Sequence, residues 1–146
     1  MLLYLDLNCF NRPFDDQTQE RVAVETASVL AVLNRVVIGV DSLVWSDALD
    51  FENSRHPLID RRGEIARWGR TAITSIPVDD RVGERAKQLA TKGFGPLDAV
   101  HVACAEAGRC DRFLTCDDRL LRASRGSSLA VLVQNPRDYV EECGHV

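Results

Sequence analysis

The sequence predicts a single α/β domain of three layers, in which a central, mainly parallel sheet is flanked by helices. Three observations indicate this fold class. Short apolar segments alternate along the chain with longer amphipathic ones, as strands and helices do around parallel sheets. Residues 1–146 fit one domain with one core and contain no repeat or long linker. The hydrophobic fraction of 45% and the charged fraction of 27% are those of an ordinary globular protein.

The first predicted strand is Leu2–Leu5, a short apolar run that stops at an acidic residue. A polar, turn-rich stretch over residues 8–16 follows. Asp16, with Gln19 three positions later, resembles a capping box and predicts a helix over residues 20–34. The apolar residues that recur at helical spacing in this segment, and are expected to face inward, are Ala23, Ala27, Leu30 and Leu33.

The middle of the chain predicts a second strand and two further helices. Residues 36–40 are apolar and β-branched, which favours a strand. Ser42 is a plausible cap for a helix over residues 42–54, which His56-Pro57 would end. A basic, helical segment is expected over residues 60–74.

The last part of the chain continues the alternation. Residues 75–78 predict a weak strand or connector, and residues 80–92 predict a helix that ends before a glycine. Pro96 opens a helix that runs to Gly108. Residues 112–115 and 129–133 predict the remaining strands.

Composition excludes several classes of protein. No apolar run approaches the roughly 20 residues that span a bilayer, and no basic region precedes the apolar start. A cytoplasmic protein without a membrane segment is expected. The five cysteines are odd in number and include no C-x-x-C pair, which argues against a disulfide framework and a thiolate zinc site. The net charge of −4 gives no general attraction to a polyanion, so a role on nucleic acid needs localised basic groups or bound metal.

Two acidic residues directly follow predicted strands. Asp6 comes after the first strand, and Asp117 lies just past the strand over residues 112–115. In open α/β sheets, ligands bind in the crevice outside the carboxyl ends of the strands. Asp6 and Asp117 are therefore candidates for one shared site, although each of them alone is also explained as a turn former.

Two more acids lie on predicted helices. Trp45, Leu49 and Glu52 stand at positions i, i+4 and i+7, so Glu52 lies on a stripe expected to face the core. Asp98 lies in a first helical turn, where it complements the helix dipole, yet it shares a face with Val102 and Ala105. Each acid has a structural explanation of its own. Four acids at one end of one sheet, however, repel one another unless a divalent cation neutralises them.

Four segments resemble those of PIN domains. Residues 4–8 (YLDLN) resemble the opening strand of that family, in which an acid is followed two residues later by Asn. Residues 95–103 (GPLDAVHVA) resemble its Asp-Ala-x-His-x-Ala helix start, and residues 113–120 (FLTCDDRL) its strand ending in Thr-x-Asp. Residues 49–52 (LDFE) match the place where the family carries a Glu. The motifs occur in the family's order and cover nearly the whole chain, so residues 1–146 are expected to form one PIN domain.

The resemblance implies a metal-dependent endoribonuclease that hydrolyses RNA phosphodiester bonds. Its implied metal ligands, which would hold one or two Mg²⁺ or Mn²⁺ ions partly through water, are Asp6, Glu52, Asp98 and Asp117. Asn8 would hydrogen-bond the Asp6 carboxylate, and Thr115 would orient Asp117 or a metal-bound water. Asp47 and Asp50 remain alternatives to Glu52. His101 is expected to pack on the core side of its helix and bond to the backbone, with metal ligation as the alternative.

The size of the chain resembles that of the VapC-type toxins of bacterial toxin–antitoxin pairs. This likeness implies an RNA substrate, an antitoxin partner and a homodimer, whose interface would use the aromatic and arginine side chains around Trp68. Two alternatives remain: a catalytically inactive PIN-fold binding module, and a PIN nuclease outside any toxin–antitoxin pair. A haloacid-dehalogenase-like phosphoryl transferase is disfavoured because Asn8 stands where that class requires a second acid.

Overall fold

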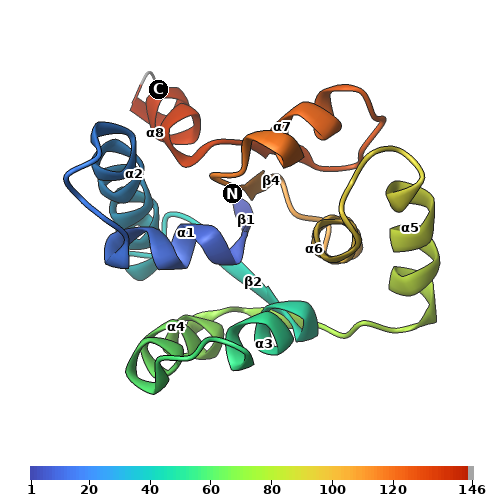
Figure 1. Cartoon of the computed structure of the whole chain (residues 1–146), viewed down its shortest axis with the longest axis horizontal. Coiled ribbons are helices and arrows are strands. Elements are labelled where there is room, and N and C mark those ends of the chain that lie inside the picture. The colour runs from blue at the N-terminus through green and yellow to red at the C-terminus, as the bar shows by residue number, and fades with distance from the viewer. Residues whose placement is uncertain (145–146) are drawn as a thin grey trace.

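The computed structural model describes residues 1–144 and contains a five-stranded, all-parallel sheet with helices on both faces (Figure 1). The expected three-layer α/β domain is thereby confirmed. The strands lie in the order β3-β2-β1-β4-β5. Their bounds are β1 Leu2–Leu5, β2 Ser42–Ser46, β3 Thr74–Ile76, β4 Arg112–Leu114 and β5 Leu132–Gln134.

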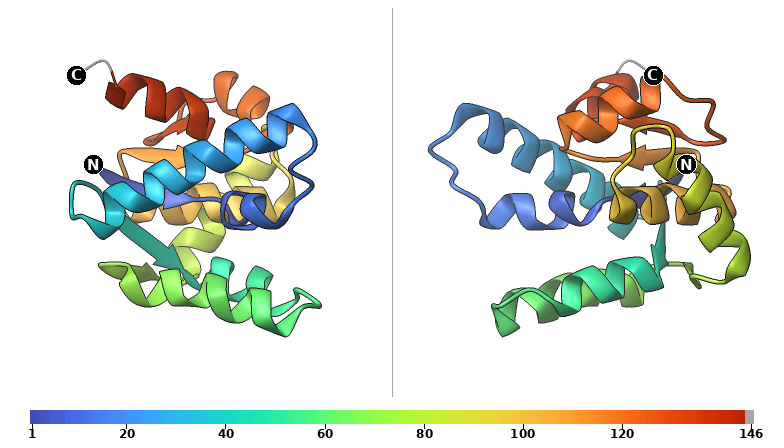
Figure 2. Two further views of the ribbon diagram at one scale, coloured as in Figure 1. Left: turned by 90° about the vertical axis from the view of Figure 1, so that its left-hand side faces the viewer. Right: turned by 45° about the vertical axis from the view of Figure 1, so that its right-hand side comes forward.

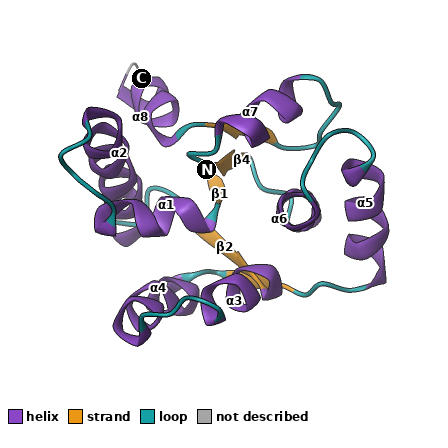
Figure 3. Cartoon of the chain, in the orientation of Figure 1, coloured by secondary structure: helices purple, strands orange, loops and turns teal. Residues whose placement is uncertain are grey.

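Helices surround this sheet (Figure 3). Their bounds are α1 Leu7–Asn11, η1 Arg12–Phe14, α2 Glu20–Val37, α3 Asp47–Ser54, α4 Ile59–Thr71, α5 Asp80–Ala90, α6 Pro96–Ala107, α7 Asp118–Arg125 and α8 Pro136–Gly144. Helices α2 and α8 pack together on one face of the sheet, and α5 and α6 pack together on the other (Figures 1 and 2). In the part of the chain that the structure describes, no helix is long and apolar enough to cross a membrane.

Strand β1 occupies the centre of the sheet. It pairs with β2 through Leu3 and Leu43, and with β4 through Tyr4 and Phe113. Tyr4 and Leu5 are fully buried, because a central parallel strand is covered by helices on both faces. The residue that follows β1 therefore lies in the middle of the carboxyl edge, where ligands of parallel sheets bind.

The second strand was predicted one segment too early. Helix α2 continues to Val37, and residues 38–41 form a turn in which Gly39 has a φ of +81°. The strand is Ser42–Ser46, which the sequence had placed in a helix. A strand buried on both faces shows no polar alternation, and serines at both its ends resemble helix caps. Ser46 is the residue that caps α3, since its side chain accepts a hydrogen bond from the Leu49 amide.

The inward face of α2 also differs from the prediction. Leu30 is 52% exposed and Ala27 is exposed, whereas Val22, Val29 and Val32 are buried. The predicted capping box is absent, because the Asp16 carboxylate binds Thr18 in the preceding turn and Gln19 stands at the N-cap. The small helices α1, α7 and α8 were not predicted from the sequence. The five cysteines are free thiols, as expected.

Candidate functional site

Asp6 lies at the carboxyl end of β1 and is only 5% exposed. Its carboxylate caps α1 by accepting a hydrogen bond from the Leu7 amide at 2.8 Å. The second carboxylate oxygen accepts from Asn8 Nδ2 at 3.1 Å and from Thr115 Oγ1 at 2.8 Å. All three donors are electrically neutral. They fix the orientation of the carboxylate without balancing its charge.

Asn8 and Thr115 join the loop after β1 to the loop after β4. Asn8 Nδ2 donates to Thr115 Oγ1 at 3.2 Å, and Asn8 Oδ1 accepts from the Cys116 amide at 3.1 Å. Thr115 Oγ1 accepts from the Asp117 amide at 3.0 Å. The expected contact between Asn8 and Asp6 is present. Thr115 holds the backbone of Asp117, as expected, and it also binds Asp6 directly.

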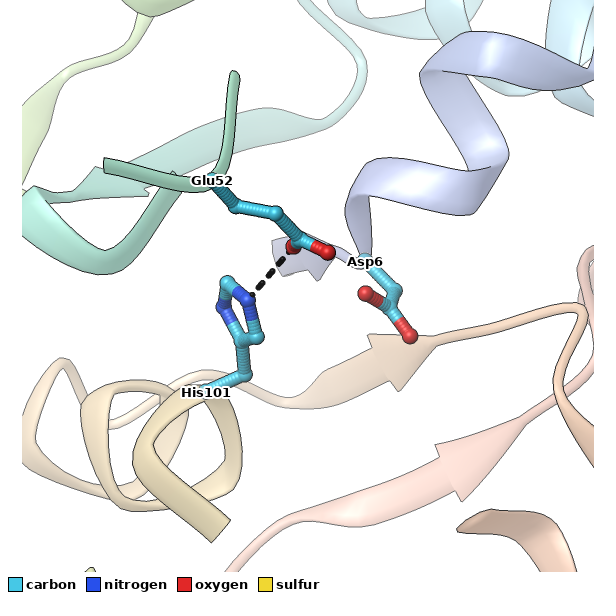
Figure 4. A group of neighbouring side chains, drawn as sticks. All are labelled: Asp6, Glu52 and His101. Carbon is cyan, nitrogen blue, oxygen red and sulfur yellow. Dashed lines mark hydrogen bonds and ion pairs between the residues drawn. The ribbon is translucent and has the colours of Figure 1, made fainter. Parts of the chain in front are cut away.

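Glu52 reaches the same site from α3. One ligand atom each of Asp6, Glu52 and His101 lies within 4.8 Å of the others, and Figure 4 shows the three side chains converging from separate elements. The two alternative acids of α3 point to other partners. Asp50 accepts from the Trp45 indole at 2.7 Å, and Asp47 accepts from the Val78 amide at 3.3 Å. Glu52 is therefore the acid of α3 that lies beside Asp6.

The helical pattern of Trp45, Leu49 and Glu52 was predicted wrongly at Trp45, because that residue belongs to β2 and not to the helix. The position of Glu52 follows instead from where α3 begins. Ser46 starts the helix at Asp47, Leu49 is fully buried, and Glu52 emerges next to it with a side chain that is 32% exposed.

Asp98, at the start of α6, and Asp117, after β4, lie close to each other in the second part of the site. Asp98 is in the first turn of α6, and Val102 and Ala105 on its face are fully buried, as predicted. Asp117 caps α7 by accepting from the Arg119 amide at 2.8 Å. Asp98 and Asp117 line a small cavity of about 70 Å³. Burial raises the pKa of Asp98, and the nearby charges of Asp117 and Glu52 raise it further.

The acidic side chains of the site outnumber the basic side chains beside them, which in the described part of the chain are His101 and Arg119. Burial raises the pKa of Asp6 to about 6, against the opposing effects of His101 and Thr115, and the charges of Asp98 and Glu52 add to the rise. Among residues 1–144, no lysine or arginine forms an ion pair with any of these three acids or with Asp117. Carboxylate oxygens in this arrangement fit a hard divalent cation such as Mg²⁺ or Mn²⁺.

His101 has partners that the sequence did not predict. It is buried on the core side of α6, as expected, but it bonds to side chains and not to the backbone. Its Nδ1 lies 2.7 Å from Tyr4 Oη, and its Nε2 lies 2.9 Å from Glu52 Oε1. No role was predicted for Tyr4 from the sequence. This residue lies on β1 two positions before Asp6, a spacing that places two side chains on the same face of an extended segment.

Comparisons with known proteins agree with this architecture. The chain is similar to a chain of FitAcB from Neisseria gonorrhoeae, with a TM-score of 0.60 and 19% identity, over 93% of this chain and 98% of that one. It is similar to a chain of FitAB bound to an IR36 DNA fragment, with a TM-score of 0.58 and 20% identity, over 94% and 96%. It is also similar to a chain of VapBC2 from Rickettsia felis bound to a promoter DNA fragment, with a TM-score of 0.58 and 14% identity, over 92% and 98%.

At these identities the solved structures establish the fold alone. A search of curated protein sequences gives no match. The family model of the PIN domain matches residues 3–126, a range that includes all four acids. The chain therefore belongs to the PIN domain family, whose members are generally nucleases.

Proposed function

We propose that this chain is a metal-dependent endoribonuclease that hydrolyses RNA phosphodiester bonds. The observation that carries the proposal is the convergence of four acids, from four separate segments, to which no lysine or arginine of residues 1–144 is paired. The residues proposed to hold one or two Mg²⁺ or Mn²⁺ ions are Asp6, Glu52, Asp98 and Asp117. A bound ion supplies a water of lowered pKa and neutralises the charge that builds on the phosphate during hydrolysis.

The side chains have distinct tasks in this proposal. Asn8 and Thr115 hold the Asp6 carboxylate in one orientation, so that its free lone pairs face the site. Asp98 and Asp117 form the wall of the small cavity, and the exposed side chain of Arg119 also lines it. A guanidinium in this place is suited to bind a backbone phosphate of the substrate.

We further infer that the chain is the toxin of a type II toxin–antitoxin pair, with an antitoxin protein as partner. Support comes from its similarity to chains of FitAB and VapBC2 over nearly their whole length. Retention of four acids disfavours an inactive binding module, while a PIN nuclease outside any pair remains the second candidate. A homodimer and a cytoplasmic location stay predictions. Trp68 gives the dimer little support, because it packs partly buried against the core.

The nuclease proposal is tested by Asp98→Asn with Asp80→Asn as its matched control. Both aspartates lie in the first turn of a helix, but Asp80 is exposed on α5 and lines neither the small cavity nor the Asp6–Glu52–His101 cluster. Cleavage of a labelled structured RNA with Mg²⁺ should fall about 100-fold or more in Asp98→Asn, because a metal ligand is lost. Asp80→Asn should cleave like the wild type. Equal cleavage by Asp98→Asn and the wild type, or wild-type cleavage that persists in EDTA, would reject the proposal.

A further inference from the structure

Behind Glu52, three buried polar side chains form a continuous chain of hydrogen bonds. Tyr4 Oη lies 2.6 Å from Ser46 Oγ and 2.7 Å from His101 Nδ1. His101 Nε2 then lies 2.9 Å from Glu52 Oε1. Tyr4 and Ser46 are fully buried, and His101 is 1% exposed. Such groups are costly to bury unless every donor finds an acceptor.

One assignment of protons satisfies the whole chain. An ionised Glu52 accepts a hydrogen bond, so the facing His101 Nε2 must carry a proton. With a neutral ring, His101 Nδ1 is then an acceptor, and the Tyr4 hydroxyl donates to it. Ser46 Oγ accepts from the Leu49 amide at 3.1 Å and donates its own proton to Tyr4 Oη.

These hydrogen bonds connect the N-cap residue of α3 to a residue within α3. Ser46 caps α3 at its start, and Glu52 lies six residues further along. Tyr4 stands between them on the central strand, where its ring stacks on Phe113 at 5.2 Å and meets the His101 ring edge-on at 5.8 Å. The packing leaves Tyr4 little freedom, so its hydroxyl is a fixed reference point for both His101 and the cap of α3.

We propose that Tyr4 and His101 are positioning residues of the metal site. Tyr4 holds His101 in the tautomer that donates its Nε2 proton to one oxygen of Glu52, which leaves the other oxygen on the side of Asp6 (Figure 4). The inference rests on the proposed function, in which Glu52 is a metal ligand. Neutral donors that orient a ligating carboxylate typically change metal affinity or activity by about 10–100-fold when they are removed.

The test is Mn²⁺ binding by metal-free Tyr4→Phe, with Tyr139→Phe as its matched control. Each variant loses one buried hydroxyl, since the Tyr139 hydroxyl donates to Asp41 at 2.8 Å, at the opposite edge of the sheet. Both should lower the melting temperature. Only Tyr4→Phe should weaken Mn²⁺ binding measured by calorimetry, by about tenfold. His101→Gln, which keeps an N–H donor toward Glu52, should bind Mn²⁺ more tightly than His101→Leu.

Two spectroscopic readouts separate positioning from general stability. In metal-free protein, the ¹⁵N shifts of His101 should show protonated Nε2 and unprotonated Nδ1 in the wild type and Tyr139→Phe, and a mixture of tautomers in Tyr4→Phe. Pulsed EPR of bound Mn²⁺ should show no directly coordinated nitrogen. A nitrogen ligand, or equal Mn²⁺ affinity in the two tyrosine variants, would overturn the positioning role. A wild type that does not bind Mn²⁺ would overturn the metal centre and the positioning role together.

Discussion

Two buried aspartates, one at the carboxyl ends of the strands and one at their amino ends, have different surroundings. Asp6 follows β1 and is 5% exposed, while Asp41 precedes β2 and is 3% exposed. Asp41 binds the Met1 amino group at 2.9 Å, Arg35 Nε at 2.8 Å and the Tyr139 hydroxyl at 2.8 Å. Within residues 1–144, Asp6 accepts hydrogen bonds only from neutral donors, and its neighbours include Glu52 and His101.

The pKa values of the two carboxyls are shifted in opposite directions. Although burial acts to raise the pKa of Asp41, the hydrogen bonds from Arg35, the amino terminus and Tyr139 lower it. Burial raises the pKa of Asp6 to about 6, and the neighbouring acids add to the rise. Burial alone therefore does not identify a functional acid. The fold supplies cations to Asp41, whereas under the proposed function a bound cation would balance the charge of Asp6.

Removing the charge of each aspartate in turn should separate their roles. Asp6→Asn should lower Mg²⁺-dependent cleavage by about 100-fold or more, because a ligand is lost. Its melting temperature at pH 7 should equal or exceed that of the wild type, since a repulsive buried charge disappears. RNA cleavage and thermal unfolding on the same preparation check both. Full activity of Asp6→Asn would place Asp6 with the structural acids.

The opposite result is expected at Asp41. Asp41→Asn should lower the free energy of unfolding by about 2 kcal/mol, because the half-buried Arg35 and the Met1 amino group lose a buried anionic partner. Cleavage per folded molecule should match the wild type. Urea unfolding measures the stability. An RNA cleavage assay at a temperature where both proteins are folded measures the cleavage per folded molecule. Loss of activity without loss of stability would contradict the structural role of Asp41.

The stability of the metal-free protein should depend on pH in a direction that Asp6 sets. Its pKa is raised in the folded state from 3.8 to about 6, so the fold favours the protonated form. The contribution of Asp6 to the free energy of unfolding is therefore fully present below about pH 4. This contribution, at most about 3 kcal/mol, is lost as the pH rises from about 4 to 6.

Asp6→Asn should remove this component from the profile of unfolding free energy against pH. Asp41 acts in the opposite sense, because its lowered pKa stabilises the fold above its ordinary pKa and this stabilisation is lost in stronger acid. Identical profiles for the wild type and Asp6→Asn between pH 4 and pH 6 would refute the raised pKa.

Mn²⁺ should also stabilise the proteins that keep Asp6. Mn²⁺ at 100 times its dissociation constant should stabilise the wild type by about 2.7 kcal/mol at pH 7, by binding only the folded state. Asp41→Asn should gain the same increment from its lower starting point. Asp6→Asn should gain little. An equal increment in all three proteins would show that Mn²⁺ binds elsewhere.

The sequence predicted the parts of the site that depend on local order. Asp6 and Asp117 follow strands, and Asp98 starts a helix after Pro96, so their place at the carboxyl edge follows from the alternation of elements. Glu52 was predicted from a helical pattern that included Trp45, but Trp45 lies on a strand. The position of Glu52 depends on where β2 ends, and a strand buried on both faces gives no periodic signal.

The hydrogen bonds behind Glu52 could not be predicted from the local order of the sequence. Tyr4 and His101 are 97 residues apart and meet only because β1 lies between β2 and β4 with α6 packed over it. The sequence correctly predicted a buried His101. Its partners depend on strand order, which the sequence of elements does not fix.

The strand order has a consequence for synthesis of the protein on the ribosome. The central strand β1 is made well before its neighbour β4, which begins only at Arg112, so one side of β1 stays unpaired until that later segment is made. Asp117 and Thr115 arrive with that same late segment. A nascent chain therefore cannot assemble the acidic centre ahead of the sheet, and late pairing between distant segments predicts slow folding. This order of assembly delays formation of the acidic site until β4 and the loop that follows it have been made.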